Sequence, residues 1–165
     1  MFFKKILLFL CIICTYFLSV PSSFAFDKAN RLGLGASTEL QTSFPAISFK
    51  LQKNKTFAFG GLLGVSTDTQ NGGQGVGVKL YRNIFDEPQL NFYMAGMGAF
   101  LNNKINSTSY SGFQFDLSFG SEFHFAGLNS LGLSFEFGVS AYKLNNFIFR
   151  TLGNNFFVSA VHFYL

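Results

Sequence analysis

The sequence feature that most constrains the fold is a stretch of alternating residues, FQFDLSFGSEFHF, that runs from Phe113 to Phe125. Its odd-numbered positions are apolar apart from one serine, and its even-numbered positions are polar, charged or glycine. Successive side chains of a β-strand leave opposite faces, so this alternation predicts a long strand. One face is nearly all phenylalanine while the other carries Asp116, Glu122 and His124, which favours a strand whose apolar face meets lipid.

Residues 1–25 have the pattern of a secretory signal peptide. Two lysines precede an apolar run at 6–18, and small residues precede a cleavage site after Ala25. The run is shorter than the ~20 residues that a membrane-spanning helix needs, which argues against an N-terminal anchor. We therefore expect the chain to consist of a cleaved signal peptide, 1–25, and one β-barrel domain, 26–165.

The composition of the mature chain excludes several classes of site. Both cysteines, Cys11 and Cys14, lie in the signal peptide, so no disulfide or thiolate metal site is expected after cleavage. Removal of Lys4 and Lys5 leaves ten basic against eight acidic residues, a net charge of +2. No basic run remains that would bind nucleic acid, and we expect neither a cofactor nor a nucleic-acid partner.

The mature chain divides into eight segments with strand-like alternation. They cover residues 30–37, 44–52, 56–66, 75–85, 90–101, 113–125, 131–142 and 155–165. The fifth segment is apolar on both faces, so its facing is not fixed by the pattern. Export without a second apolar helix leaves two destinations, a soluble exported β-protein or a transmembrane barrel.

The lengths of the connections between the segments are independent evidence for a membrane barrel. Those after the second, fourth and sixth segments are short, whereas three on the opposite side are long, including a polar loop at 102–109 and an unusually apolar loop at 143–155. Short periplasmic turns with longer external loops are typical of bacterial barrels. Segments of about ten residues also suit tilted strands that cross hydrocarbon.

With these features the whole mature chain resembles the small eight-stranded outer-membrane barrels of Gram-negative bacteria, the OmpX-like proteins and the transmembrane domain of OmpA-like proteins. The most specific part is the C-terminal strand, 157–165, which is similar to the signal that such proteins present to the barrel-assembly machinery. Family members usually end in Phe, whereas this chain ends in Leu165, and it lacks the Trp residues of the usual aromatic girdle. The resemblance implies an all-β, eight-stranded antiparallel up-and-down transmembrane β-barrel in the cell outer membrane, with lipid and the assembly machinery as partners.

A soluble lipocalin-like barrel is the alternative, with its apolar side chains turned into a cavity. Phenylalanine at nearly every second position would overfill a small interior. We therefore favour the membrane barrel.

In the favoured orientation, seven ionisable side chains point into the barrel. They are Arg31, Lys50, Lys79, Asp116, Glu122, His124 and Glu136. Buried charges must be paired, so we interpret them as a structural salt-bridge network rather than as catalytic groups. We expect Glu136→Leu to strand a cation and to lower the unfolding temperature.

An enzyme that modifies lipid A is one alternative function. The two histidines, His124 and His162, are both expected to point inward, and no hydrolase or phosphate-binding motif occurs. A narrow porin-like channel is another alternative. Eight strands leave an interior that side chains just fill, although the many small inward residues would permit a thin water path.

Two outward features favour interaction with an outer-membrane protein partner. One is an apolar group in the loop after the seventh segment, which either forms contacts or extends the neighbouring strands: Phe147, Ile148, Phe149 and Leu152. The other is a lipid-facing docking patch with small residues, which would admit a partner or simply relieve curvature: Gly61, Val78, Gly96 and Gly98. The function we expect is therefore a non-enzymatic structural, adhesive or partner-binding scaffold.

Overall fold

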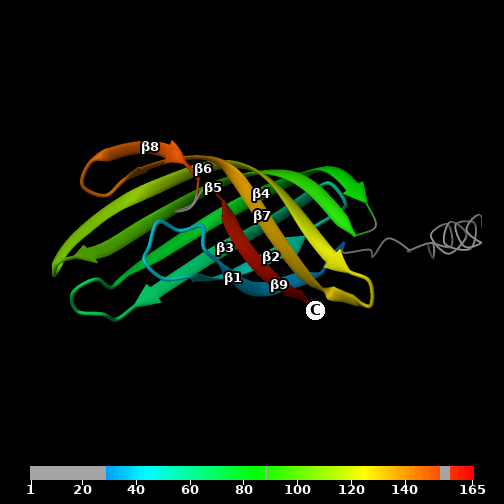
Figure 1. Cartoon of the computed structure of the whole chain (residues 1–165), viewed down its shortest axis with the longest axis horizontal. Helices are drawn as coiled ribbons and strands as arrows, with labels where there is room; N and C mark the ends of the chain where they lie inside the picture. The colour runs from blue at the N-terminus through cyan, green and yellow to red at the C-terminus, as the bar shows by residue number, and fades with distance from the viewer. Residues whose placement is uncertain (1–28, 88, 153–156) are drawn as a thin grey trace, which may run out of the picture.

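The computed structural model describes residues 29–87, 89–152 and 157–165 (Figure 1). The expected signal peptide, 1–25, lies outside these residues. The described chain is all β, and it contains no helix long and apolar enough to cross a membrane.

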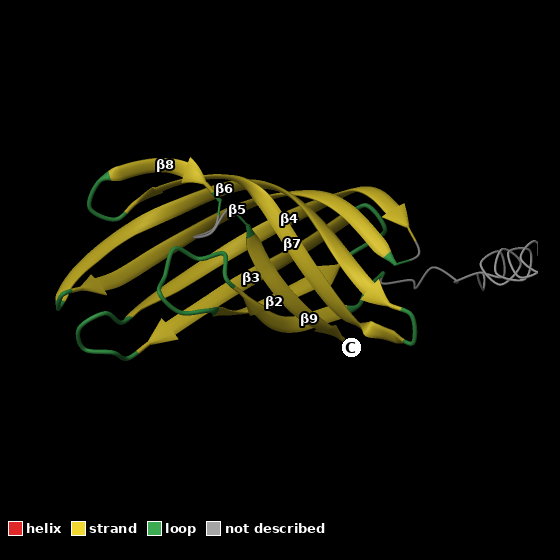
Figure 2. Cartoon of the chain, in the orientation of Figure 1, coloured by secondary structure: helices red, strands yellow, loops and turns green. Residues whose placement is uncertain are grey.

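Nine strands occur in the described residues (Figure 2). They are β1 (Leu32–Ser37), β2 (Ala46–Gln52), β3 (Phe57–Ser66), β4 (Gly73–Glu87), β5 (Leu90–Ile105), β6 (Thr108–Phe125), β7 (Leu128–Lys143), β8 (Phe147–Thr151) and β9 (Val158–Tyr164). Consecutive strands from β1 to β7 pair antiparallel, β9 pairs with β7, and β1 pairs with β9. These eight strands close an antiparallel barrel, and β8 is an additional strand.

The strands place apolar side chains outside the barrel and most of the charged side chains inside it, although the inner face of β5 is itself largely apolar. On β6, Asp116 and Ser118 are 3% and 4% exposed, whereas Leu117 between them is 68% exposed. On β5, the strand whose facing the sequence left open, Tyr93 is buried and Phe100 points outward. The Phe113–Phe125 stretch therefore alternates as predicted, with its polar residues inside the barrel and its apolar residues outside.

Glycines on the inner face make room for large side chains. A Cβ atom at Gly120 would lie 2.7 Å from Cζ of Tyr93, and one at Gly33 would lie 3.0 Å from a ring carbon of Tyr164. Tyr93 packs edge-on against Tyr81, with ring centroids 5.4 Å apart. The space beside these small residues, which the sequence left open as a water path, is occupied by tyrosine rings.

The connection between β5 and β6 differs from the expected loop at 102–109. Both strands continue through this range, and only Asn106 and Ser107 form the turn, with φ angles of 50° and 67°. Two central residues with positive φ give a tight hairpin whose twist matches that of the strands. The polar composition of this range reflects an exposed hairpin tip rather than a loop.

The connection between β3 and β4 is ordered by Asp68. Its Oδ1 atom accepts hydrogen bonds from the backbone N–H groups of Gln70 and Asn71, at 2.7 and 3.1 Å. Both bonds favour the charged carboxylate and hold the pKa of Asp68 below its ordinary value. This turn contacts the β5–β6 hairpin, because the N–H of Ser107 donates to the carbonyl of Gln70.

The predicted loop at 143–155 also contains a strand. Phe147 to Thr151 form β8, which pairs with β7 from Val139 to Lys143. β9 pairs with the same edge of β7 from Leu131 to Glu136, so β8 and β9 follow one another along it. Leu152 is fully buried, so it cannot belong to an exposed interaction surface with its neighbours. Residues 153–156 lie outside the described residues.

Candidate functional site

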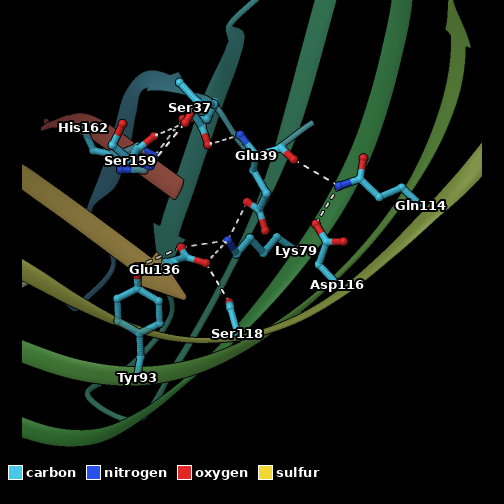
Figure 3. A network of polar contacts seen from close by, with 12 residues as sticks. Ser37, Glu39, Lys79, Tyr93, Gln114, Asp116, Ser118, Glu136, Ser159 and His162 are labelled. Carbon is cyan, nitrogen blue, oxygen red and sulfur yellow. Dashed lines mark hydrogen bonds and ion pairs between the residues drawn. The ribbon is translucent and has the colours of Figure 1, made fainter. Parts of the chain in front are cut away.

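The polar interior contains two lysine-centred clusters, and the first surrounds Lys79 of β4 (Figure 3). Its Nζ atom lies 2.6 Å from Oε2 of Glu136 and 2.5 Å from Oε2 of Glu39. The hydroxyls of Tyr93 and Ser118 donate to Glu136 at 2.9 and 2.7 Å. Lys79 and Glu136 are 1% and 3% exposed, so this is a buried and extensively hydrogen-bonded ion cluster.

The barrel register explains how the Lys79 cluster forms. Lys79 pairs with Gly60 of β3, and Glu136 pairs with Gly120 of β6. Neither glycine has a side chain to fill the lumen, so the lysine and the glutamate can extend into it from their strands. The glycine beside Glu136 also admits the ring of Tyr93, which supplies one of its hydrogen bonds.

The second cluster surrounds Lys50 of β2. Its Nζ atom donates to Oε2 of Glu122 at 2.9 Å, and the hydroxyl of Tyr164 donates to Oε1 of the same carboxylate at 2.6 Å. The ammonium also lies over the rings of Tyr81 and Tyr93, 4.7 and 4.8 Å from their centroids. Such cation–π contacts stabilise a charge that has left water. The ring centroid of Tyr81 also lies 5.2 Å from the Lys79 ammonium, and the Tyr93 hydroxyl donates to Glu136, so the two tyrosines lie between the two lysine clusters and contact both.

A segment between β1 and β2 supplies the carboxylate of Glu39. This segment, residues 38–45, is called the strap below, and it folds into the barrel at the end opposite the C-terminus (Figure 1). Leu40 of the strap belongs to an apolar cluster with Leu62, Met97 and Leu101. Glu39 and Leu40 are both at most 2% exposed. The strap therefore fills the lumen between Lys79 and the end of the barrel opposite the C-terminus.

Side chains from three further strands hold the strap. Gln114 of β6 donates to the carbonyl of Glu39 at 3.0 Å and accepts from the N–H of Gln41 at 2.9 Å. Asn103 of β5 donates to the carbonyl of Gln41 at 2.8 Å. Arg150 of β8 donates to the side-chain carbonyl of Gln41.

The remaining predicted network residues lie beside these clusters. Asp116 accepts a 2.6 Å hydrogen bond from Gln114, and Nε2 of His124 lies 3.7 Å from a carboxylate oxygen of Glu122. Arg31 lies half-buried immediately before β1. The structure thus places six of the seven predicted residues in or beside two clusters.

Ser48 and His162 form the pair that most resembles part of a hydrolase site. Oγ of Ser48 lies 2.8 Å from Nε2 of His162, and both residues are at most 4% exposed inside the barrel. Among the described residues, no group of three or more His, Cys, Asp or Glu side chains is placed to hold a metal ion.

The sequence interpretation missed several members of the clusters. Tyr81 and Tyr164 follow the inward parity of their strands, which could have linked them to the charged residues, whereas Tyr93 lies on the fifth segment, whose facing the pattern does not fix. Glu39 gives no such signal, because the strap has no strand periodicity and its fold depends on contacts with distant strands.

The two outward features meet on the outer wall, because Phe149 of β8 lines the same apolar hollow as Val78, Gly96 and Gly98. Phe147 and Phe149 of β8 are 63% and 67% exposed. Val78, Gly96 and Gly98 line an apolar hollow of about 620 Å³ on the outer wall. Gly61 does not line it, because a Cβ atom there would lie 2.5 Å from the ring of Phe49, which covers this position.

No protein-family model, curated protein sequence or solved structure matches this chain. The geometry of the barrel is therefore the basis for any statement about its function.

Proposed function

We propose that this chain is an integral β-barrel protein of the cell outer membrane that acts as a non-enzymatic structural or partner-binding scaffold. The observation that carries the proposal is the reversed polarity of the barrel. Each of the nine described strands exposes at least one large apolar side chain on the outside, while the ion clusters lie inside. Soluble monomers rarely expose continuous apolar patches larger than a few hundred Å².

The closed ring of strands supports the membrane location. In hydrocarbon, unpaired backbone N–H and C=O groups are costly, and a closed barrel pairs them between neighbouring strands. The outward residues of β9 and the C-terminus, Val161, Phe163 and Leu165, continue the apolar surface to the end of the chain. This supports the expected contact of residues 157–165 with the barrel-assembly machinery.

The filled lumen favours a scaffold over the porin-like channel. The interior is occupied by the two lysine clusters, by the rings of Tyr81 and Tyr93, and by the strap. We expect no stepwise conductance when the purified barrel is incorporated into a planar bilayer. Regular conductance steps at a constant voltage would contradict the closed lumen and favour the channel.

The membrane location is tested by an arginine scan in two positions. Leu117 is 68% exposed at the middle of β6, and Val65 is 63% exposed near the end of β3, on its outward face. Arginine at a bilayer midplane costs about 2–4 kcal/mol and near an interface about 0–1 kcal/mol. We expect Leu117→Arg to lower the free energy of unfolding from liposomes by the larger amount and Val65→Arg by the smaller.

The contrary outcome of this test is also specific. If the outer wall faces water, both arginines lie on an exposed surface and change stability equally little. Equal effects, together with a folded protein recovered without lipid or detergent, would overturn the membrane proposal.

Partner binding is tested on the outward face of β8. We expect a protein that co-purifies from detergent-solubilised outer membrane to be lost when Phe147 and Phe149 are both replaced by Ser. The matched control is Phe100→Ser on β5, which is also an outward phenylalanine, 74% exposed. Equal recovery of the companion with both variants would exclude β8 as the contact surface.

A further inference from the structure

The strap is attached to the barrel differently from the strands. Its first residue, Thr38, continues the ladder, because its N–H donates to the carbonyl of Ser159 at 3.1 Å. From Glu39 to Pro45, in the described chain, no hydrogen bond joins the strap main chain to the main chain of a strand. The one main-chain bond there is internal, from Thr42 to Leu40. The strap can therefore move out of the lumen without breaking the main-chain hydrogen bonds between the strands of the barrel.

Side chains provide the attachment instead. Gln114 and Asn103 bind strap main-chain groups, and Arg150 binds the Gln41 side chain. Leu40 provides an apolar anchor, and the absence of a side chain at Gly75 makes room for it, since a Cβ atom there would lie 3.0 Å from a Leu40 methyl carbon. The strap is therefore held by side-chain contacts and not by the main-chain hydrogen bonds of the sheet.

Release of the strap leaves the buried charge of Lys79 with a partner of opposite charge. In the closed state Lys79 contacts two carboxylates, Glu39 and Glu136. When Glu39 leaves, Lys79 keeps the Glu136 carboxylate, and Gln114 keeps its bond to Asp116. Glu39 regains hydration, which removes the penalty of burying an excess carboxylate.

We propose that the strap is a lid that opens by local unlatching and exposes a chamber in the lumen, which is lined by polar residues and by the apolar residues Leu62, Met97 and Leu101 that Leu40 covers. The chamber contains Asp116 and Ser140, and the barrel register places Ser140 between Asp116 and Arg150. Asp116 and Ser140 are both at most 3% exposed when the lid is closed. The lid goes beyond the scaffold function and does not depend on the membrane location, because it concerns the interior alone.

The lid is tested by the accessibility of two cysteines on β7. Ser140→Cys reports on the chamber, and Ser134→Cys reports on the part of the lumen beside Glu122, which the strap does not cover. In the unaltered protein Ser140 and Ser134 are 0% and 3% exposed. Cys11 and Cys14 are replaced by Ala, which leaves one thiol in each protein. The rate of reaction with a water-soluble maleimide is then measured with and without the lid-releasing changes Leu40→Ala and Gln41→Ala.

We expect the lid-releasing changes to raise the reaction rate of Ser140→Cys about tenfold, because loss of buried contacts shifts a local opening equilibrium by that order. Ser134→Cys should react no faster. The control change Thr38→Ala, at the laddered end of the strap, should leave both rates unaltered. Equal rates for Ser140→Cys in both backgrounds, or a parallel rise at both cysteines, would overturn the lid.

A second measurement covers the case in which the lid-releasing variant does not fold. In the unaltered strap, Ser140→Cys should become reactive at urea concentrations below the unfolding transition, while Ser134→Cys becomes reactive only within it. Simultaneous exposure of both thiols would show that the strap unfolds with the barrel, which also overturns the lid.

Discussion

The two buried lysines of the barrel have different partners. Among the described residues, Lys50 has one carboxylate within ion-pair distance, Glu122, and both belong to strands. Lys79 has two, Glu136 on β7 and Glu39 on the strap. The Lys50 cluster is thus fixed by the sheet alone, whereas the Lys79 cluster is completed by a segment outside it.

This difference determines what each cluster can tolerate. A buried lysine that loses its only carboxylate is an uncompensated charge, and such charges are strongly destabilising. A lysine with two carboxylates can lose one and remain paired. We therefore expect the three carboxylates to differ in their contribution to stability, in the order Glu122, Glu136, Glu39.

The largest effect is expected for Glu122→Leu. The change leaves Lys50 buried without its carboxylate and removes the acceptor of the Tyr164 hydroxyl, at a cost of about 3–5 kcal/mol in the free energy of unfolding. Urea denaturation followed by far-ultraviolet circular dichroism measures it. The double variant Lys50→Met with Glu122→Leu should recover most of the loss, because it buries no charge at either position. A double variant as unstable as the single one would show that the loss came from packing.

A smaller effect is expected for Glu136→Leu. From the sequence, this change should strand a cation, but the structure shows that Glu39 still contacts Lys79. The remaining cost is that of the bonds from Tyr93 and Ser118 and of one ion pair, about 2 kcal/mol. Thermal and urea unfolding should show a loss that becomes as large as that of Glu122→Leu only when Glu39→Gln is added. If Glu136→Leu alone costs as much as Glu122→Leu, Glu39 does not compensate Lys79.

The parts of this arrangement that follow strand periodicity could be predicted from the sequence. Lys50, Lys79, Glu122 and Glu136 all alternate with outward apolar residues, so their convergence in the lumen follows from the parity of their strands. Parity cannot predict which lysine meets which glutamate, because that depends on contacts across the lumen between strands far apart in sequence. The expected single network therefore separates into two clusters.

The parts that depend on tertiary contacts could not be predicted. Glu39 lies in a short connection whose burial is set by side chains of β4, β5, β6 and β8. The β8 strand has only five residues, and the sequence left open whether its apolar residues form contacts or extend the neighbouring strands, which the pairing with β7 decides. In both cases the local sequence is compatible with an exposed connection, and the neighbouring strands decide the outcome.

The smallest effect is expected for Glu39→Gln, which tests the asymmetry between the clusters most directly. The amide keeps an oxygen that can accept from Lys79 and has nearly the same shape, while Glu136 still neutralises the ammonium at 2.6 Å. The change in the free energy of unfolding should be below about 1 kcal/mol, since one charge-assisted bond is replaced by a neutral one. The matched control is Glu122→Gln, which has the same chemistry at a lysine with one carboxylate and should cost several times more. If Glu39→Gln and Glu122→Gln lower the free energy of unfolding equally, the second carboxylate at Lys79 does not compensate for loss of the first. The strap could then not leave without exposing Lys79 to the loss of a needed counter-charge, and the electrostatic part of the lid proposal would be wrong.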